Sequence, residues 1–311
     1  MLVSNVIKNR RMILSWKSKA LELHHQGVSW RQIAKRLGKP KSSVSDYLRK
    51  EVKGYVKPSE VVEKPTNKVK RFNRSVKVNY DNSRILLISD LHIPYHHKDA
   101  IAFLAHLKKK YKPTRVICLG DELDKHALSY HDSDPDLKSA GDELKESLPI
   151  IAELYKMFPV MGIIESNHGS LVWRKAKTHG IPRHYIKSYN DVLGVGEGWT
   201  WHPDLVVDLP DGNRCYIHHG KSNNVVRLSQ QMGMSAVQGH YHEILSASYW
   251  GNPNGLHWGL QAGCLIDDES YAFSYNNVNL KRPVIGTALI INSLPVLEPL
   301  VMGEDGRWVG K

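Results

Sequence analysis

The chain has 311 residues, 41% of them hydrophobic, which is enough for one large domain or two smaller ones with buried cores. Its formal net charge of +12 lies entirely in residues 1–77, with 20 Lys and Arg against 5 Asp and Glu, whereas residues 78–311 hold 23 against 26. This asymmetry excludes an evenly charged protein and predicts a basic module for a polyanion, joined to a near-neutral body.

Localisation is predicted from what the chain lacks. The N-terminus has no apolar segment of the kind a secretory signal needs, and nowhere do about 18 apolar residues run unbroken, so no membrane partner is expected. Cys118, Cys215 and Cys264 lie in apolar runs with no paired spacing. Reduced, buried thiols and a cytoplasmic location are therefore expected.

Short helices separated by glycines are expected in residues 1–52, the first domain. Apolar side chains recur at helical spacing over residues 12–26, and Gly27 follows as a stop signal. A second helix is expected to begin at Ser29 and to end at Gly38. These features predict a compact all-α module.

A third helix, capped by the pair Ser42-Ser43, is expected to contact DNA. The segment from Gly27 to Leu48 resembles the helix-turn-helix of resolvases, transposases and sigma-like regulators, in which the last helix enters the major groove. This resemblance implies that exposed polar side chains on and beside the third helix bind phosphates or base edges. The residues expected to do so are Lys39, Lys41, Ser42, Ser43, Ser45, Asp46 and Arg49. A three-helix bundle that binds a protein is the alternative.

A basic linker over residues 53–80 and a catalytic domain over residues 81–311 are expected next. The linker contains two prolines and little hydrophobic periodicity. The body begins with two apolar runs that each end in aspartate, as expected for strands buried on both faces, with a helix between them. These three elements are residues 84–90, 98–110 and 115–121. A helix over about 141–157 and a strand over 160–165 follow. Later strands, which indicate a second sheet, are expected over 215–218, 236–238, 256–262 and 284–291.

Acid, amide and imidazole side chains follow these strands in five short segments. Open α/β folds place their sites at the carboxyl ends of strands. Carboxylate oxygens, an amide oxygen and imidazole nitrogens are the mixed ligand set that holds a pair of divalent ions. One Asp-x-His alone would indicate only a hydrogen-bonded pair, but five segments in order predict a two-metal hydrolase site. They are Asp90-Leu-His92, Gly120-Asp121-Glu-Leu-Asp124, Ser166-Asn167-His168, His218-His219-Gly220 and Gly239-His240-Tyr-His242.

This ordered set resembles the calcineurin-like metallophosphoesterases over roughly residues 84–291. The resemblance implies a four-layer α/β/β/α sandwich that hydrolyses phosphoesters with two divalent ions, Mn in the first place and Fe, Zn or Ni as alternatives. His219 is preferred to His218 because the family's ligand directly precedes a glycine. The implied ligands are Asp90, His92 and His242 for one ion, Asn167, His219 and His240 for the other, and Asp121 for both. His168 is implied as the general acid.

The sequence departs from the family pattern beside His168. The family usually has Glu or Asp after its Asn-His pair, whereas this chain has Gly169. Asp124 is therefore expected to orient His168, with a local turn residue as the alternative. Lys125 stands where Ser/Thr phosphatases have an arginine, and it lacks the bidentate fork. His126, Tyr130 and Arg174 are further candidates for substrate contact.

These observations predict a metal-dependent phosphodiesterase, a nuclease acting on DNA, with DNA as the main partner of the basic module. A phosphatase for small metabolites would gain nothing from a duplex reader. One alternative is a phosphomonoesterase, of the nucleotide or Ser/Thr type, that the first domain tethers to nucleic acid. Another, from a different class, is a DNA-binding regulator with an inactive site. The fold alone does not separate these functions.

Overall fold

The chain divides into two compact units, Met1–Val76 and Lys77–Lys311, each described by itself. The computed structural model describes residues 15–51, 80–130, 136–267, 269–270 and 282–310. Apart from Tyr80, the expected linker over residues 53–80 lies outside these ranges, as do residues 12–14 of the first expected helix.

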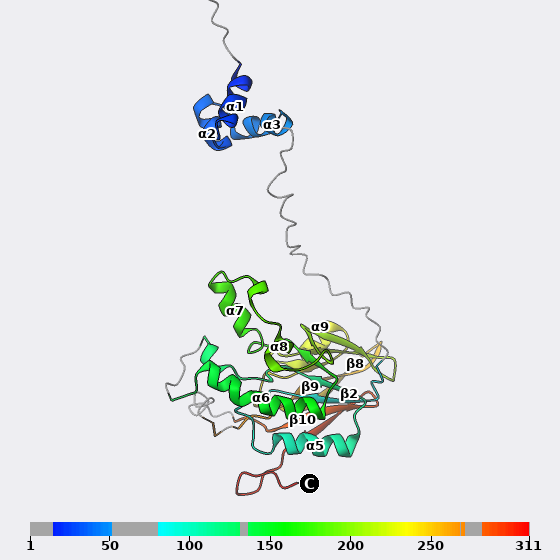
Figure 1. The fold of residues 1–311 in the computed structure, drawn as a ribbon. Helices are drawn as coiled ribbons and strands as arrows, with labels where there is room; N and C mark the ends of the chain where they lie inside the picture. Colours follow the sequence, from blue (N-terminus) through cyan, green and yellow to red (C-terminus); the bar gives the residue numbers. More distant parts are fainter. Residues whose placement is uncertain (1–14, 52–79, 131–135, 268, 271–281, 311) are drawn as a thin grey trace, which may run out of the picture. The chain divides into compact units, whose positions relative to one another are not determined.

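The first unit contains the three expected helices, α1 (Trp16–His25), α2 (Trp30–Leu37) and α3 (Lys41–Glu51) (Figure 1). The hydroxyl of Ser29 accepts a hydrogen bond from the backbone N–H of Gln32 at 3.4 Å, which caps α2. Gly38 ends this helix with a positive φ of 59°, a conformation that glycine adopts readily. The helices pack around a small core of their own, built from Ala20, Ile33, Ala34, Val44 and Leu48.

The third helix differs from its expected form in two respects. It begins at Lys41, and the N–H of Val44 donates to the carbonyl of Pro40, so Ser42 and Ser43 lie inside the first turn and do not cap it. Ser45 is only 8% exposed, because it lies on the side of the helix that faces the core, so its expected place on the exposed face was wrong. The remaining residues expected to contact DNA are exposed: Lys39, Lys41, Ser42, Ser43, Asp46 and Arg49. Their role in DNA binding stays a prediction.

The second unit has a mixed α/β fold with two sheets, as expected. The first sheet has the order β11-β10-β1-β2-β3-β4, in which β1, β2, β3 and β4 are parallel. The last two strands of the chain, β10 and β11, extend it in antiparallel pairing. Its strands are β1 (Arg84–Ile88), β2 (Arg115–Cys118), β3 (Met161–Ile164), β4 (Trp199–His202), β10 (Gly286–Ile291) and β11 (Leu294–Pro299).

The second sheet has the order β5-β6-β7-β9-β8, with parallel pairing from β6 to β7 and from β7 to β9. Its strands are β5 (Leu205–Asp208), β6 (Arg214–His218), β7 (Ser235–Gln238), β8 (Leu245–Asn252) and β9 (Gly255–Ala262). The expectation that residues 284–291 belong to this sheet was wrong. That segment contains β10, which returns to the first sheet and pairs Arg84 of β1 with Ile291.

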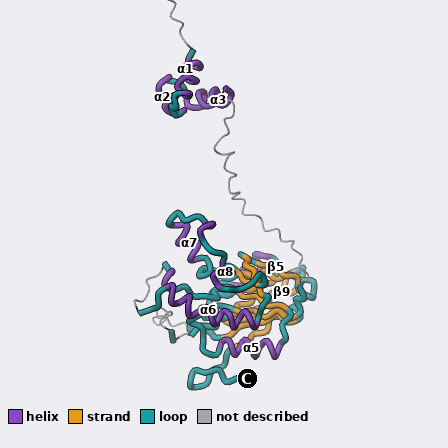
Figure 2. The backbone as a smooth tube through the Cα atoms, in the orientation of Figure 1, coloured by secondary structure: helices purple, strands orange, loops and turns teal. Residues whose placement is uncertain are grey.

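Alternation along the strands of the first sheet divides the interior into two layers. Leu86 and Ile88 face the core formed with α5 (Ala100–Tyr111) and α6 (Ala140–Met157). Ile85 and Leu87 face the other way, into the core between the two sheets. On the outer face of the second sheet, α9 (Val225–Met232) packs against β6 and β7. Figure 2 shows the strands gathered in the interior, with α5 and α6 along one side.

A run of short helices follows β3, and sequence reasoning did not predict it. In Figure 1, α7 extends away from the two sheets. The elements of this run are α7 (Leu171–Thr178), η2 (Arg183–Tyr185) and α8 (Tyr189–Leu193), and η1 (His126–Leu128) contacts α7. Among the described residues, no helix has both the length and the apolar character that crossing a membrane requires.

Candidate metal centre

The loops that follow parallel strands of both sheets carry all seven expected ligands. Asp90 and His92 follow β1, while Asp121 follows β2. Asn167 follows β3 in the same sheet. In the second sheet, His219 follows β6, and His240 and His242 follow β7. The candidate site therefore lies at the carboxyl ends of the strands, where the two sheets meet.

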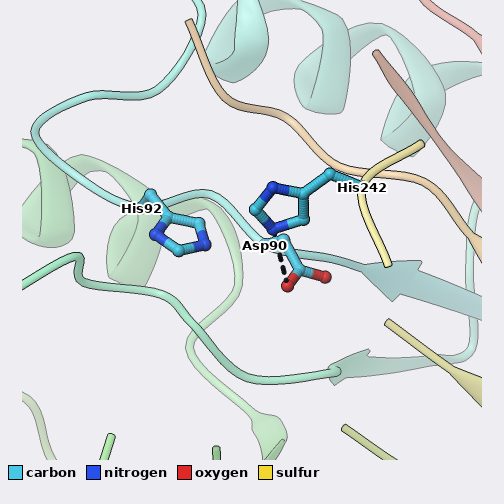
Figure 3. A group of neighbouring side chains, drawn as sticks. All are labelled: Asp90, His92 and His242. Carbon is cyan, nitrogen blue, oxygen red and sulfur yellow. Dashed lines mark ion pairs between the residues drawn. The ribbon is translucent and has the colours of Figure 1, made fainter. Parts of the chain in front are cut away.

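The first group of candidate ligands consists of Asp90, His92 and His242. One ligand atom from each lies within 4.8 Å of the others, and Figure 3 shows Asp90 and His92 on the loop after β1 with His242 from another segment. His242 Nε2 is 3.4 Å from Asp90 Oδ1. Asp90 is fully buried and also accepts a hydrogen bond from the hydroxyl of Ser89. A buried carboxylate between imidazoles is a typical cation site.

The second group consists of Asp121, His219 and His240, again with ligand atoms within 4.8 Å of one another. Asn167 joins it, because its Oδ1 lies 2.7 Å from His219 Nε2. His219 Nδ1 lies 2.9 Å from the carbonyl oxygen of Leu119, which can only accept, so Nδ1 carries a proton and Nε2 faces the centre. The structure thus brings four of the expected ligands together here.

Asp121 faces both groups. Its Oδ2 is 3.5 Å from His92 Nε2 and 3.2 Å from His219 Nε2. The backbone N–H of His240, in the second group, donates to the Asp90 carboxylate of the first at 3.0 and 3.1 Å. One carboxylate therefore spans the two groups, which is the arrangement that a bridging ligand requires.

Backbone strain is concentrated at the same residues. Four of the eight non-glycine residues with positive φ in the described chain are candidate ligands: Asp90, His92, Asp121 and His240. Each such conformation costs on the order of 1–3 kcal/mol and persists only where the surroundings fix it. At Gly239, a Cβ would lie 2.4 Å from Asp90 Oδ2, so only glycine allows the β7 loop to approach that carboxylate.

The contacts of Asp124 correct the expectation that its carboxylate orients His168. Asp124 Oδ1 lies 2.6 Å from His92 Nδ1 but 3.7 Å from His168 Nδ1. His168 Nδ1 instead contacts the backbone carbonyl of Asp124. Asp124 thus fixes the ring of a candidate ligand and leaves His92 Nε2 toward the centre, as second partners of metal-binding histidines commonly do.

The neighbours of these residues make contacts within the protein, and substrate contact by His126, Tyr130 and Arg174 stays a prediction. Lys125 is buried, and its Nζ donates to the carbonyls of His168 and Gly169 at 3.3 and 3.4 Å, so it holds the His168 loop. Arg174 lies 4.7 Å from the ring centre of Tyr130 in a cation–π contact. His126 Nδ1 is 3.8 Å from Asp124 Oδ2.

His218, the neighbour of His219, lies outside both groups. Its Nδ1 accepts from the N–H of Gly220 at 3.1 Å, and its ring stacks on Tyr216. Burial, with the nearby ammonium of Lys221, lowers the pKa of His218 to about 4, so the ring is neutral. The structure therefore brings His219, and not His218, into the second group.

The charges of the candidate ligands fit a cation site. Burial disfavours the charged form of His219, but the Asp121 and Asp90 carboxylates outweigh it and raise the pKa of His219 to about 9. Burial of Asp121 is likewise outweighed by His219, so the pKa of this carboxyl lies well below its usual range. Two carboxylates, one amide and four imidazoles are donors suited to a pair of borderline divalent cations. The residues therefore fit divalent cations, and the number of ions stays a prediction.

Comparisons with known proteins give only distant similarities. No family model matches the chain, and no curated protein matches it. Among solved structures, it is similar to the phosphoesterase YfcE from E. coli, at 14% identity and a TM-score of 0.37 over 73% of this chain and 96% of the other. Vps29 from Chaetomium thermophilum has 13% identity and a TM-score of 0.37 over 73% and 93%. The nuclease MPE from Pseudomonas putida has 15% and 0.32 over 70% and 87%. Similarities this low do not indicate a function, which has to be inferred from the geometry of the site.

The position of Asp121 predicts a defect in metal pairing. Asp121→Ala removes the one carboxylate that faces both groups, so the variant is expected to bind well under two divalent ions per chain. Elemental analysis after dialysis against Mn measures this. Asp208→Ala, at the exposed end of β5, is the matched control and should bind metal as the wild type does. Normal metal content in Asp121→Ala would contradict the bridging role.

The raised pKa of His219 predicts proton release on metal binding. The pKa of His219 is about 9 in the folded protein, against 6.5 ordinarily, so His219 is protonated near pH 7.5. Its ion pair with Asp121 therefore stabilises the fold fully below pH 6.5, and this stabilisation is lost as pH rises through about 9. A metal ligand must be deprotonated, so binding should release about one proton from His219 at pH 7.5. Calorimetry in two buffers of different ionisation enthalpy measures the number. An equal proton count in His219→Asn would contradict this assignment.

Proposed function

We propose that this protein is a metal-dependent phosphodiesterase that hydrolyses DNA. The observation that carries the proposal is the convergence of seven candidate ligands, from five loops of two sheets, on two groups that Asp121 joins. Two cations held there would neutralise phosphoryl oxygens and favour ionisation of an attacking water. In such a reaction the chain itself supplies position, charge and a proton for the leaving oxygen.

His168 is the residue in place to supply that proton. Its backbone N–H donates to Asp121 Oδ1 at 3.2 Å, which fixes it beside the centre. Its Nδ1 is held by the Asp124 carbonyl, so Nε2 is the atom that can give a proton to the leaving alkoxide. The side chain is 22% exposed, against 1% for Asp121, so substrate can reach it. These contacts support a general-acid role.

The charge of the first unit supports DNA as the substrate. Residues 1–77 carry a net charge of +15, from 20 basic and 5 acidic residues. The exposed polar residues of α3 include Lys41 and Arg49, although Arg49 shares its guanidinium with Asp46 at 3.5 Å. Neutralising phosphates with such side chains releases counterions, which is the main source of affinity for DNA.

The phosphomonoesterase alternative has less support from the site. A bidentate side chain near the centre would favour binding of a terminal phosphate. Lys125, which stands at that position, is buried and donates to backbone carbonyls. Lys125 therefore provides no bidentate contact to a terminal phosphate.

Removing His168 should affect chemistry more than metal binding. In His168→Ala we expect kcat for DNA to fall by about 10²–10⁴, because an alkoxide needs a proton to leave. A p-nitrophenyl diester should lose much less, since nitrophenolate leaves without an acid. Steady-state rates on both substrates, at saturating Mn, measure the difference. An equal loss on both would make His168 a phosphate-positioning residue.

Asp124→Asn serves as the contrasting variant in the same assay. Because the Asp124 carboxylate holds His92, this change should weaken Mn affinity by about 10–100-fold, the usual effect of losing such a partner. The loss should be overcome by added Mn, unlike that of His168→Ala. If Asp124→Asn binds Mn with wild-type affinity, Asp124 does not support the metal centre and is only a local turn residue.

A substrate panel tests the proposed function directly. Full-length protein with Mn is incubated with supercoiled plasmid, linear duplex, single strands, a p-nitrophenyl diester and p-nitrophenyl phosphate. Cleavage of DNA supports the proposal, whereas turnover of the monoester alone would favour a phosphatase. Hydrolysis of none of these substrates would overturn the enzymatic assignment.

The role of α3 is tested in the full chain with two charge-matched variants. The pair Lys41→Gln and Arg49→Gln should lower duplex affinity and reduce the slope of log K against log salt by up to about two, one unit for each phosphate that is no longer neutralised. The control pair, Lys35→Gln and Arg36→Gln on the exposed face of α2, removes equal charge. If the two pairs have equal effects, α3 adds to DNA binding only through its charge and does not contact the duplex at a defined place.

A further inference from the structure

A chamber of about 450 Å³ lies beside the candidate metal centre, between α6, α7, η2 and α8. We call it the side chamber, and its walls include Glu143, Leu144, Trp173, Tyr189, Val192 and Trp201. Ser166 and Gly169, from the loop that carries Asn167 and His168, also line it. A group bound in the side chamber would therefore lie next to the phosphoester under attack.

The walls of the side chamber suit a flat ring. Trp173, Tyr189 and Trp201 supply aromatic surface, and Leu144 and Ile186 supply aliphatic surface. Aromatic and aliphatic side chains bind a nucleobase through its faces, whichever of the bases it is.

Two residues that line the side chamber each carry a buried polar atom without a partner among the described residues. Trp201 Nε1 and Glu143 Oε2 are buried and have no hydrogen-bond partner within the described part of the chain. Buried donors and acceptors are nearly always paired, so these two are suited to a ligand that offers both an acceptor and a donor. The edge of a nucleobase offers both, whereas a hydrocarbon tail offers neither.

An anion is better suited to the exposed edge of the chamber than to its interior. The buried charged side chains of the lining are Glu122, Glu143 and Lys125, two acids against one base, so the interior disfavours a phosphate. Arg183 and Lys187 also line the chamber but are exposed, and they belong to residues 166–190, which contain five Lys and Arg and no Asp or Glu. Three of the exposed cations of this segment, which we call the basic arm, are Lys177, Arg183 and Lys187. None of the ion pairs found among the described residues involves them.

We propose that the side chamber and the basic arm bind one unpaired nucleotide of the substrate strand, with its base in the chamber and its flanking phosphates on the arm. This inference rests on the proposed phosphodiesterase function and names the form of nucleic acid that the site takes. A chamber of about 450 Å³ holds one base and its sugar but not a stacked duplex. The base must therefore come from a single strand, a strand end or a nucleotide turned out of the duplex.

Two diesters with the same leaving group test the chamber. Thymidine 5′-(p-nitrophenyl phosphate) carries a base, and methyl p-nitrophenyl phosphate does not. Full-length protein with Mn should prefer the thymidine ester in kcat/KM by about tenfold or more, the contribution expected from one stacked base. Val192→Phe fills the chamber and should lower this preference to about twofold, while Trp201→Phe, which removes the N–H donor and one ring of the indole, should lower it less. A preference that Val192→Phe leaves intact would overturn the proposal.

A binding measurement separates this proposal from the hydrolase function. Thymidine 5′-monophosphate should quench tryptophan fluorescence in the wild type, because Trp173 and Trp201 line the chamber, and Val192→Phe should abolish the quenching. That result supports the chamber even if no ester is hydrolysed, which would overturn only the enzymatic proposal. If Val192→Phe melts below the wild type, the substrate preference of Trp201→Phe decides instead. An unchanged preference in Trp201→Phe, or absence of quenching in the wild type, overturns the assignment.

The basic arm is tested with a decamer of thymidylate, which has phosphates on both sides of a base. The triple change Lys177→Gln, Arg183→Gln and Lys187→Gln should weaken binding of the decamer and reduce its salt slope by about two, with the smaller coefficient of single strands. The control triple, Lys98→Gln, Lys109→Gln and Lys156→Gln, removes equal charge from exposed sites elsewhere on the same unit. Equal losses in the two triples would overturn the role of the arm.

Discussion

The candidate metal centre depends on the contacts of the buried Asp121 carboxylate with the histidines around it. It is 1% exposed, and one of its oxygens faces His92 from the first sheet and His219 from the second. Burying a charge is costly unless an opposite charge lies beside it. In the metal-free protein the protonated His219 supplies that charge, and a bound cation would supply it in its place. The site is therefore built around a negative charge that always needs a positive partner.

The strained loops around this carboxylate stabilise one another. The N–H of Leu119 donates to the carbonyl of Ile88 at 2.7 Å, and the N–H of His92 donates to the carbonyl of Asp121 at 2.8 Å. These bonds continue the parallel pairing of β1 and β2 past the ends of both strands. Left-handed backbone at Asp90 and Asp121 is thus held by the neighbouring loop. These backbone contacts fix the positions of the candidate ligands, as a preorganised site requires.

Sequence patterns predicted the parts of the structure that local rules determine. An apolar run followed by Asp90 or by Asp121 marks a buried strand and its carboxyl end, because both features lie within one segment. Contacts between distant segments were not predictable in this way. The place of β10 beside β1 depends on strand order, which apolar runs do not encode. The pairing of Asp124 with His92, 32 positions away, depends on how two loops align.

Net charge also concealed the basic arm. Residues 78–311 have a net charge of −3, which predicts no affinity for a polyanion, yet residues 166–190 within them carry five cations and no acid. The electrostatic potential at a surface depends on where charges lie and not on their sum. Here Glu122 and Glu143 are buried in the lining of the side chamber, whereas Arg183 and Lys187 are exposed at its edge. This distribution would favour a phosphate on the exposed arm and an uncharged base in the chamber, as the proposal requires.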